Sequence, residues 1–298
     1  MKKNSVKIVV LGKEGQLARS LRTLSQSRDL DIHFFSSREV DLLATEKLDA
    51  IFKNIEYDIL INTSAYTLVD KAEIEKDKAY VINALSVKKL AEITKDKNAK
   101  LIHFSTDYVY GDKGSEFLSE ESATLPLNNY GLTKLQGENF IFEVGVRNLI
   151  FRTSWVFSPW GTNFLKTMLR VGSEREVIKV VSDQIGAPTY ALALAESVLS
   201  ILEKWETPKQ DGIYNISGGD NCSWYDFAKL IFEKARQLDF KINVKNLIAI
   251  SSEEYPVAAV RPINSRMCLD KIKKTFDIRI PTLQENVDDC LKRLKLEK

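Results

Sequence analysis

The opening of the chain constrains the fold most, because it reads as a strand, a glycine turn and a helix in direct succession. Residues 6–11 are a short apolar run that stops at Gly12, and apolar residues recur at helical spacing from Gly15 onward. This pattern is typical of the first unit of a dinucleotide-binding sheet, where glycines let the backbone approach a pyrophosphate and the helix presents unpaired N–H groups to it. Ala18 stands at the third small position, and an ordinary strand-to-helix turn stays the alternative.

Further apolar runs follow at intervals that leave room for helices. We expect strands at residues 32–36, 57–62, 101–107, 149–155 and 212–217, and an apolar helix over 191–205. The sequence therefore predicts an α/β fold, a doubly wound Rossmann-like parallel sheet with a smaller α/β substrate-binding domain. We expect the dinucleotide-binding domain over residues 1–155, with a return segment at about 190–217, and the substrate domain over 156–189 and 218–298.

Local sequence also predicts details outside the sheet. Asn163 is expected to anchor the start of a helix, and Ser223 with Asp226 is expected to form a capping box at the start of another. The loop over residues 111–126, rich in Gly, Ser and Glu, is expected to be exposed, with Glu120 solvated.

Tyr130 and Lys134 are the strongest candidates for chemistry. They lie four positions apart, so on a helix both side chains project from one face. A tyrosine has a pKa of about 10, and a neighbouring cation lowers that pKa, so the phenol could donate a proton to a ketone oxygen. Thr106, at the end of an apolar run, could give the same oxygen a second hydrogen bond, whereas Ser105 should point the other way and pack. An ordinary helix turn is the alternative reading of this spacing.

Four motifs in this order carry a resemblance to a known family. They are GKEGQL at residues 12–17, STDYVY at 105–110, YGLTK at 130–134 and RTSWV at 152–156. The chain resembles the extended short-chain dehydrogenase/reductases and, within them, the dTDP-4-dehydrorhamnose reductase family. The resemblance runs nearly end to end and implies NAD(P)H-dependent reduction of the 4-keto group of dTDP-4-dehydro-6-deoxy-L-mannose to dTDP-L-rhamnose.

The resemblance also implies roles for particular residues. Tyr130 would donate the proton, Lys134 would lower the Tyr130 pKa and hold the nicotinamide ribose, and Thr106 would orient the keto oxygen. The cofactor-binding residues are expected to be Gly12, Gly15, Gln16, Leu17, Ser37, Arg38, Asp41, Asn62, Ala65, Tyr66, Tyr130 and Lys134. The substrate-binding residues are expected to be Thr67, Val69, Thr106, Asp107, Trp155, Asn163 and Arg261.

The segment after the second strand favours NADPH over NADH. NAD-preferring enzymes place an acidic residue here to hold the adenosine ribose, but this chain has Ser36, Ser37 and Arg38. Hydroxyls and a guanidinium suit a 2′-phosphate. NADH stays open because Asp41 could still contact a ribose, and a solvated loop residue is the alternative reading of Arg38.

Composition narrows the function classes. The chain has 43 lysines and arginines against 41 aspartates and glutamates, without a basic stripe, which argues against nucleic acid as a partner. No apolar stretch approaches the roughly 18 residues of a membrane span, and the three cysteines have no CxxC spacing, so we expect a cytoplasmic protein. His33 and His103 are expected to pack or bond locally, which argues against a histidine metal centre. The resemblance further implies a sugar nucleotide as partner, a homodimer, and Mg²⁺ whose ligands the sequence does not place.

Three alternatives to this function stay open at the level of sequence. The first is a reductase of another nucleotide-linked 4-ketosugar, because pocket contacts cannot be read from spacing. The second is an epimerase or dehydratase, against which the missing acid after the second strand counts. The third is a non-catalytic regulatory subunit of the methionine adenosyltransferase type, against which the presence of Thr106, Tyr130 and Lys134 counts.

Overall fold

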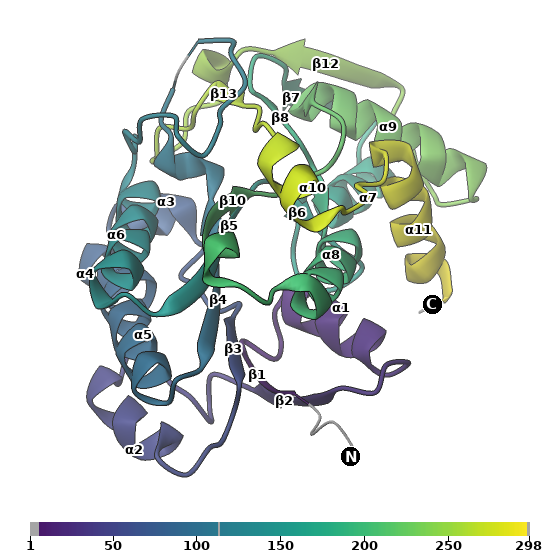
Figure 1. Ribbon diagram of the computed structural model, residues 1–298. Coiled ribbons are helices and arrows are strands. Elements are labelled where there is room, and N and C mark those ends of the chain that lie inside the picture. Colours follow the sequence, from purple (N-terminus) through teal and green to yellow (C-terminus); the bar gives the residue numbers. More distant parts are fainter. Residues whose placement is uncertain (1–5, 113, 297–298) are drawn as a thin grey trace.

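A six-stranded sheet forms the centre of the protein, here described from a computed structural model over residues 6–112 and 114–296 (Figure 1). The strand order is β10-β5-β4-β3-β1-β2, and every pairing is parallel. The strands are β1 (Lys7–Leu11), β2 (Asp31–Phe35), β3 (Ile59–Asn62), β4 (Lys100–Thr106), β5 (Arg147–Thr153) and β10 (Gly212–Asn215). The predicted parallel sheet is confirmed, with strand ends displaced by one or two residues.

Helices cover both faces of this sheet (Figure 1). One face carries α1 (Gln16–Ser25), α8 (Ala191–Lys204) and α10 (Asp270–Phe276), and the other carries α2 (Leu48–Phe52), α5 (Ser86–Asp96) and α6 (Asn129–Val144). Side chains alternate along β1, so that Val10 packs with the first set and Val9 with the second. Burial on both faces explains why the inner strands are continuous apolar runs.

A glycine lets α6 approach the segment before α5 closely. That segment comprises α3 (Val69–Ala72), α4 (Lys76–Tyr80) and the π-helical turn η2 (Val81–Leu85). A Cβ on Gly137 would lie 2.2 Å from the carbonyl oxygen of Asn83, so a larger residue would push the helices apart. The buried Asn83 amide accepts from the Tyr66 backbone N–H at 2.9 Å and donates to Thr133 Oγ1 at 3.1 Å. Asn83 therefore ties the loop after β3 to the helix that carries Tyr130.

The rest of the chain forms a smaller layer with its own apolar core. Helices α7 (Phe164–Glu174), α9 (Trp224–Gln237) and α11 (Leu283–Leu296) pack with the strand pair β7 (Val177–Val181) and β12 (Asn246–Ile250). The short strands are β6 (Val156–Phe157) paired with β9 (Thr189–Tyr190), and β11 (Cys222–Ser223), β8 (Ile185–Gly186) and β13 (Asn264–Ser265) in one sheet. Short 3-10 turns are η1 (Thr45–Lys47), η3 (Asp107–Val109), η4 (Pro208–Gln210) and η5 (Ser252–Glu254).

Both helix starts predicted in this half are confirmed. Asn163 Oδ1 accepts from the Lys166 backbone N–H at 3.1 Å at the start of α7. Ser223 and Asp226 form a reciprocal capping box at the start of α9.

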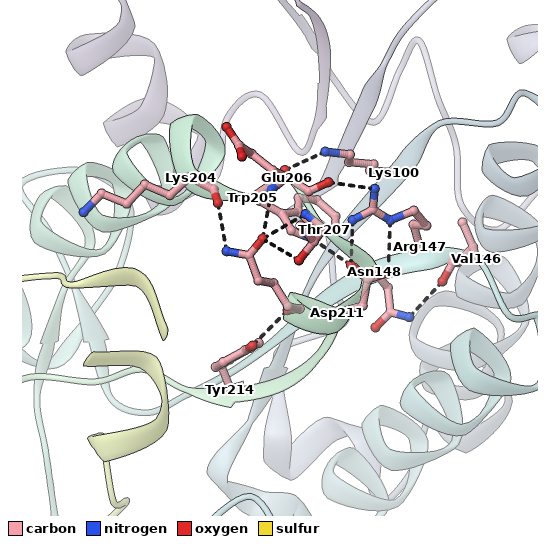
Figure 2. A network of polar contacts seen from close by, with 11 residues as sticks. Lys100, Val146, Arg147, Asn148, Lys204, Trp205, Glu206, Thr207, Asp211 and Tyr214 are labelled. Atoms are coloured by element: carbon pink, nitrogen blue, oxygen red, sulfur yellow. Dashed lines mark hydrogen bonds and ion pairs between the residues drawn. The ribbon is translucent and has the colours of Figure 1, made fainter. Parts of the chain in front are cut away.

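A polar network fastens the returning segment between α8 and β10 to the sheet (Figure 2). Asp211 accepts from Trp205 Nε1 at 2.7 Å and from both Nε and Nη2 of Arg147, while Lys100 Nζ donates to the Trp205 carbonyl at 2.6 Å. Lys100 and Arg147 are the first residues of β4 and β5, so this network lies at the amino edge of the sheet. The network holds β10 in the sheet beside β5. The division of the chain into two domains stays a prediction.

The loop after β4 differs from expectation. Leu118 is buried and bonds through its backbone N–H to the Arg266 carbonyl at 2.7 Å, while its own carbonyl accepts from Cys268 N. Glu120 accepts a hydrogen bond from the Asn215 backbone N–H at 2.8 Å. The prediction that Glu120 is solvated is therefore wrong, because contacts to the far end of the chain hold this part of the loop down.

Within residues 6–112 and 114–296, helices that combine the length and the apolar character needed to cross a bilayer are absent.

Candidate active site

A cleft of about 680 Å³ lies at the carboxyl edge of the sheet, where open α/β sheets bind ligands. Its walls come from the turns after β1, β2 and β3, from the ends of β4 and β5, and from the start of α6. Many of the residues predicted to bind a cofactor line it. These are Gly12, Gly15, Gln16, Leu17, Ser37, Asp41, Ala65, Tyr130 and Lys134, and Thr67, predicted for substrate, lines it as well.

Gly12 is a position where only glycine fits. Its φ is +92°, in the left-handed region, and a Cβ there would lie 2.8 Å from the side-chain oxygens of both Thr63 and Ser64. The turn is fixed from the other side by the Phe35 carbonyl, which accepts from the Gly12 N–H at 3.0 Å. The backbone of the glycine turn therefore packs directly against the end of β3.

The start of α1 has the features of an anion-binding site. Gly15 occupies the N-cap position and offers no side-chain cap, so the first N–H groups of the helix remain available to an acceptor. Backbone N–H groups and the positive end of the helix dipole favour a phosphate group here.

Two residues of the cleft wall have buried hydroxyl groups that form no hydrogen bond among the described residues. Ser105 and Thr153 line the cleft, and within residues 6–112 and 114–296 their buried Oγ and Oγ1 atoms have no hydrogen-bond partner. A hydroxyl buried without a partner is costly, so these groups suit a ligand with amide or hydroxyl groups of its own. Ser105 is 4% exposed, so its expected packing role stays a prediction, and the residue also contributes to the cleft wall. Together with the helix start, these groups fit a dinucleotide.

Tyr130 lines the cleft near the carboxyl end of β4. Burial raises the pKa of Tyr130 to about 12, with a smaller opposing effect from its hydrogen bond with Thr106 and a smaller raising effect from the Asp107 charge. The expectation that Lys134 lowers this pKa does not hold in this structure, because the shift goes the other way and Lys134 is not among its causes. The phenol is therefore fully protonated at neutral pH.

Lys134 lies one helical turn from Tyr130 but its amine faces β4. Nζ donates to the Phe104 carbonyl oxygen at 2.5 Å and lies 3.1 Å from Nε2 of His103. Burial lowers the pKa of Lys134 to about 8, with the Glu138 carboxylate acting in the opposite direction. Glu138 is itself held by Arg152 in a buried ion pair, with Nε to Oε1 at 3.0 Å.

A second cavity of about 740 Å³ adjoins this site on the side of the smaller layer. Tyr108 lines it, and the Tyr108 ring contacts the Tyr130 ring edge-on with centroids 5.6 Å apart, so this pair of rings connects the walls of the two cavities. Arg261, predicted for substrate, lines this second cavity and forms an ion pair with Asp70 at 2.7 Å. Lys179 and Trp224 also line it, and sequence reasoning did not single them out.

Several predicted cofactor-binding residues lie off the cleft wall. Arg38 is exposed in the turn after β2 and is not part of the wall. Asn62 is buried and bonds to His103, and Tyr66 is buried with its backbone bonded to Asn83. Because both lie at or just after the end of β3, which reaches the cleft, sequence position alone did not separate wall residues from those packed behind the wall.

Only some of the predicted substrate-binding residues line one of the two cavities. Thr106, Val69, Asp107, Trp155 and Asn163 do not line either cavity. Trp155 stacks on Trp224 with ring centroids 3.5 Å apart and so supports the wall of the second cavity. Asn163 caps α7 and donates to Gln16 Oε1 at 2.9 Å, which joins the smaller layer to the cleft.

Asp107 is a buried carboxyl next to these groups. Its side chain is 2% exposed, and it accepts from Thr106 Oγ1 at 3.0 Å. Burial raises the pKa of Asp107 to about 6, although hydrogen bonds from Ser265 and Thr106 oppose the shift.

Throughout the part of the chain that the structure describes, no cluster of three or more His, Cys, Asp or Glu side chains could hold a metal ion, and the magnesium ligands remain unplaced.

Comparison with known proteins gives one consistent result. The family model described as RmlD substrate binding domain matches residues 6–296. The dTDP-4-dehydrorhamnose reductase of Escherichia coli (strain K12) is 39% identical over 292 residues, which cover 96% of this chain and 97% of that protein. The solved dTDP-4-dehydrorhamnose reductase of Clostridium acetobutylicum has a TM-score of 0.90 at 32% identity, covering 97% and 99% of the two chains. That of Bacillus anthracis, in complex with NADP, has a TM-score of 0.89 at 35% identity, covering 99% and 100%.

Proposed function

Since this chain belongs to the family of the RmlD substrate binding domain, that of the dTDP-4-dehydrorhamnose reductases, we propose that it uses NADPH to reduce the 4-keto group of dTDP-4-dehydro-6-deoxy-L-mannose. The product is dTDP-L-rhamnose. The observation that carries this proposal is that Tyr130, on the wall of a cleft suited to a dinucleotide, contacts Tyr108 on the wall of a second cavity of similar size. Such an arrangement lets two ligands meet at one proton donor.

Tyr130 and the residues around it have different roles in the reduction. NADPH, when bound, supplies the hydride. Tyr130 donates the proton to the keto oxygen, and its pKa of about 12 keeps the phenol in the protonated form that a donor requires. Thr106, which hydrogen-bonds Tyr130, orients the same oxygen. Lys134, which lines the cofactor cleft, holds the nicotinamide ribose.

The preference for NADPH rests on the turn after β2. Ser37 and Asp41 line the cleft, and Arg38 between them is exposed and free to reach a 2′-phosphate at the surface. The related Bacillus anthracis structure contains NADP, which supports the same preference.

An assay of NADPH oxidation tests the proposal. Purified protein is offered dTDP-4-dehydro-6-deoxy-L-mannose and a small panel of other nucleotide-linked 4-ketosugars, each with NADPH and with NADH. We expect the named substrate to give the highest kcat/KM, with NADPH preferred. Faster turnover of a different ketosugar would replace the substrate, and absence of turnover with every ketosugar would refute the reductase function.

Replacing Tyr130 by Phe tests the proton donor. The change removes the hydroxyl and keeps the ring that packs against Tyr108, so we expect reduction to fall by about 10²-fold or more. NADPH affinity, measured by fluorescence titration, should change little. A Tyr130→Phe variant that turned over at the wild-type rate would remove Tyr130 from this role.

The sugar nucleotide as partner belongs to the same proposal. The homodimer and the cytoplasmic location stay predictions, which sedimentation equilibrium and cell fractionation would check.

A further inference from the structure

A carboxylate from further along the chain folds back onto the end of β2. Ser36 is the first residue after β2, and its backbone N–H, at 2.8 Å, and its hydroxyl, at 2.7 Å, both donate to Oε2 of Glu39. The turn is closed by the Glu39 N–H, which donates to the Ser36 carbonyl at 3.1 Å. The structure therefore places a negative charge at the end of this strand, although the sequence has no acidic residue directly after it.

This turn lies beside the cofactor cleft. Ser37 and Val40 line the cleft, so Glu39, which is exposed, lies at its rim. The glycine turn adjoins the same place, because the Lys13 backbone N–H donates at 3.0 Å to the carbonyl of Phe35, the last residue of β2. A ligand that enters the cleft at the end of β2 therefore meets this turn.

Two opposite recognition chemistries meet at this turn. In dinucleotide-binding sheets, an acidic residue near the second strand accepts from the 2′-hydroxyl of the adenosine ribose in NAD, whereas an arginine accommodates the 2′-phosphate of NADP. Glu39 supplies a carboxylate, and its exposed neighbour Arg38 supplies a guanidinium. Both bonds from Ser36 go to Oε2, so Oε1 has no hydrogen-bond partner among the residues that the structure describes and can accept from a ligand hydroxyl.

The Glu39 carboxylate is charged at neutral pH. The hydrogen bonds from the Ser36 N–H and hydroxyl hold the pKa of Glu39 below its usual value, and the Lys13 charge acts in the same direction. A phosphate monoester carries about −1.5 to −2 charges at pH 7, so the Glu39 carboxylate repels a 2′-phosphate. An uncharged 2′-hydroxyl can instead donate to it.

We infer that Glu39 is a specificity-determining residue, whose carboxylate favours the adenosine ribose of NADH, opposes the 2′-phosphate of NADPH, and so limits the preference for NADPH that Arg38 provides. The inference deepens the proposed use of NADPH and rests on it. Cofactor binding, measured without a sugar nucleotide, tests the role of Glu39 separately from reduction.

A purely local role in closing the turn is the alternative. Closure of the turn needs an acceptor oxygen at position 39, but it does not need a negative charge. Glu39→Gln keeps an oxygen that can accept from Ser36 and removes the charge, whereas Glu39→Ala removes both. The two variants therefore separate the effect of the charge from that of the turn.

Fluorescence titration of the full chain with NADPH and with NADH measures both dissociation constants. We expect Glu39→Gln to raise the ratio of the Kd for NADH to the Kd for NADPH about tenfold, which is the order of magnitude of the repulsion between a phosphate and a carboxylate a few ångströms apart in water. Glu39→Ala should shift the ratio in the same direction. A ratio that stayed at the wild-type value in Glu39→Gln, or that changed only in Glu39→Ala, would overturn the inference.

Adenosine 2′,5′-bisphosphate and AMP, which differ only in the 2′-phosphate, locate the effect when each competes with NADPH. The gain in Glu39→Gln should be confined to the bisphosphate, and Arg38→Gln should weaken the bisphosphate and leave AMP unchanged. Glu46→Gln is the matched control, because it removes an exposed carboxylate of η1 outside the cleft wall and should leave every ratio unchanged.

Equal gains for AMP and the bisphosphate, or an equal shift in Glu46→Gln, would show that the Glu39 charge does not act on the 2′-phosphate. A chain that bound neither cofactor would overturn both the inference and the proposed function. A chain that bound both cofactors but reduced no ketosugar would refute the proposed function alone, and the affinity ratios would still decide the role of Glu39.

Discussion

Among single residues, Asp107 has the clearest consequence for stability. An unfolded Asp titrates at about 3.9, whereas burial raises the pKa of Asp107 to about 6. The folded protein therefore binds this proton more tightly, so the stability that the proton contributes is complete below about pH 4 and is lost as the pH rises through about 6. We expect the free energy of unfolding of Asp107→Asn, measured in urea titrations, to be about 2 to 3 kcal/mol higher than that of wild type at pH 8. At pH 3.5 the two free energies should be equal.

Asp183 provides the opposite case as a control. Burial would raise the pKa of Asp183, but hydrogen bonds from Ser252 Oγ at 2.5 Å and Ser252 N at 2.8 Å outweigh it and lower that pKa. Asp183→Asn should therefore destabilise the protein at pH 8 and have little effect at low pH. If both variants changed stability equally at the two pH values, the shift at Asp107 would not be the cause.

The sequence could not predict which partners hold individual side chains at the site. The spacing of Tyr130 and Lys134 correctly placed both on one helix at the cleft. Their spacing could not show that the Phe104 carbonyl and His103 hold the amine, because these partners come from β4, about 30 positions upstream. Likewise, which of Ser105 and Thr106 faces the cleft depends on how β4 ends, which composition does not encode.

At the scale of elements, the start of α6 joins the proton donor to the second cavity. Asn128 is its N-cap: Oδ1 accepts from the Gly131 N–H at 2.8 Å, and Nδ2 donates to the Val260 carbonyl at 2.8 Å. We expect Asn128→Ala to lower the free energy of unfolding by roughly 1 to 3 kcal/mol, because it removes a cap and a buried hydrogen bond. Asn128→Asp keeps the cap oxygen and should lose only roughly 1 kcal/mol.

Thermal or urea unfolding of the two variants separates the two contributions. If both variants lost the same unfolding free energy, the cap would contribute nothing and only the contact with Val260 would stabilise the protein. A larger loss for Asp than for Ala would contradict both assignments.

Elements with a regular period could be predicted, and those held by distant partners could not. The strands and the starts of α7 and α9 follow from apolar runs and capping residues within a few positions of each other. The loop around Leu118 and Glu120 is fixed by Arg266 and Asn215, about 100 or more positions away. The π-helical turn η2 depends on Gly137 of α6 in the same way.

Across the whole molecule, the two edges of the sheet serve different purposes. The amino edge is closed by the network of Lys100, Arg147, Trp205 and Asp211, in which each polar group is bonded within the protein. At the carboxyl edge, by contrast, Ser105 Oγ and the uncapped start of α1 have no side-chain partner among the residues that the structure describes. Stability and ligand binding are thus separated along the strand direction, as expected for open α/β sheets.

The contact of Asp70 with Ala259 and Arg261 ties the wall of the second cavity to α3. Asp70 Oδ2 accepts from Arg261 at 2.7 Å and Oδ1 accepts from the Ala259 N–H at 3.1 Å, and Ala259 and Arg261 line that cavity. Exposed ion pairs contribute little to stability, so we expect Asp70→Ala to change the free energy of unfolding by less than about 1 kcal/mol. Because the cavity wall would lose two anchors, the KM for the sugar nucleotide should rise several-fold.

Affinity for NADPH should stay unchanged in Asp70→Ala, because this contact lies on the side of the second cavity and not at the glycine turn. Glu174→Ala is the matched control: it breaks an exposed ion pair with Arg170 on α7, outside the walls of both cavities. Steady-state kinetics with each substrate varied in turn, together with a titration of NADPH, distinguishes the effects. If NADPH binding weakened as much as sugar-nucleotide binding, the two cavities would not be separate binding sites, and the division of ligands between them would have to be abandoned.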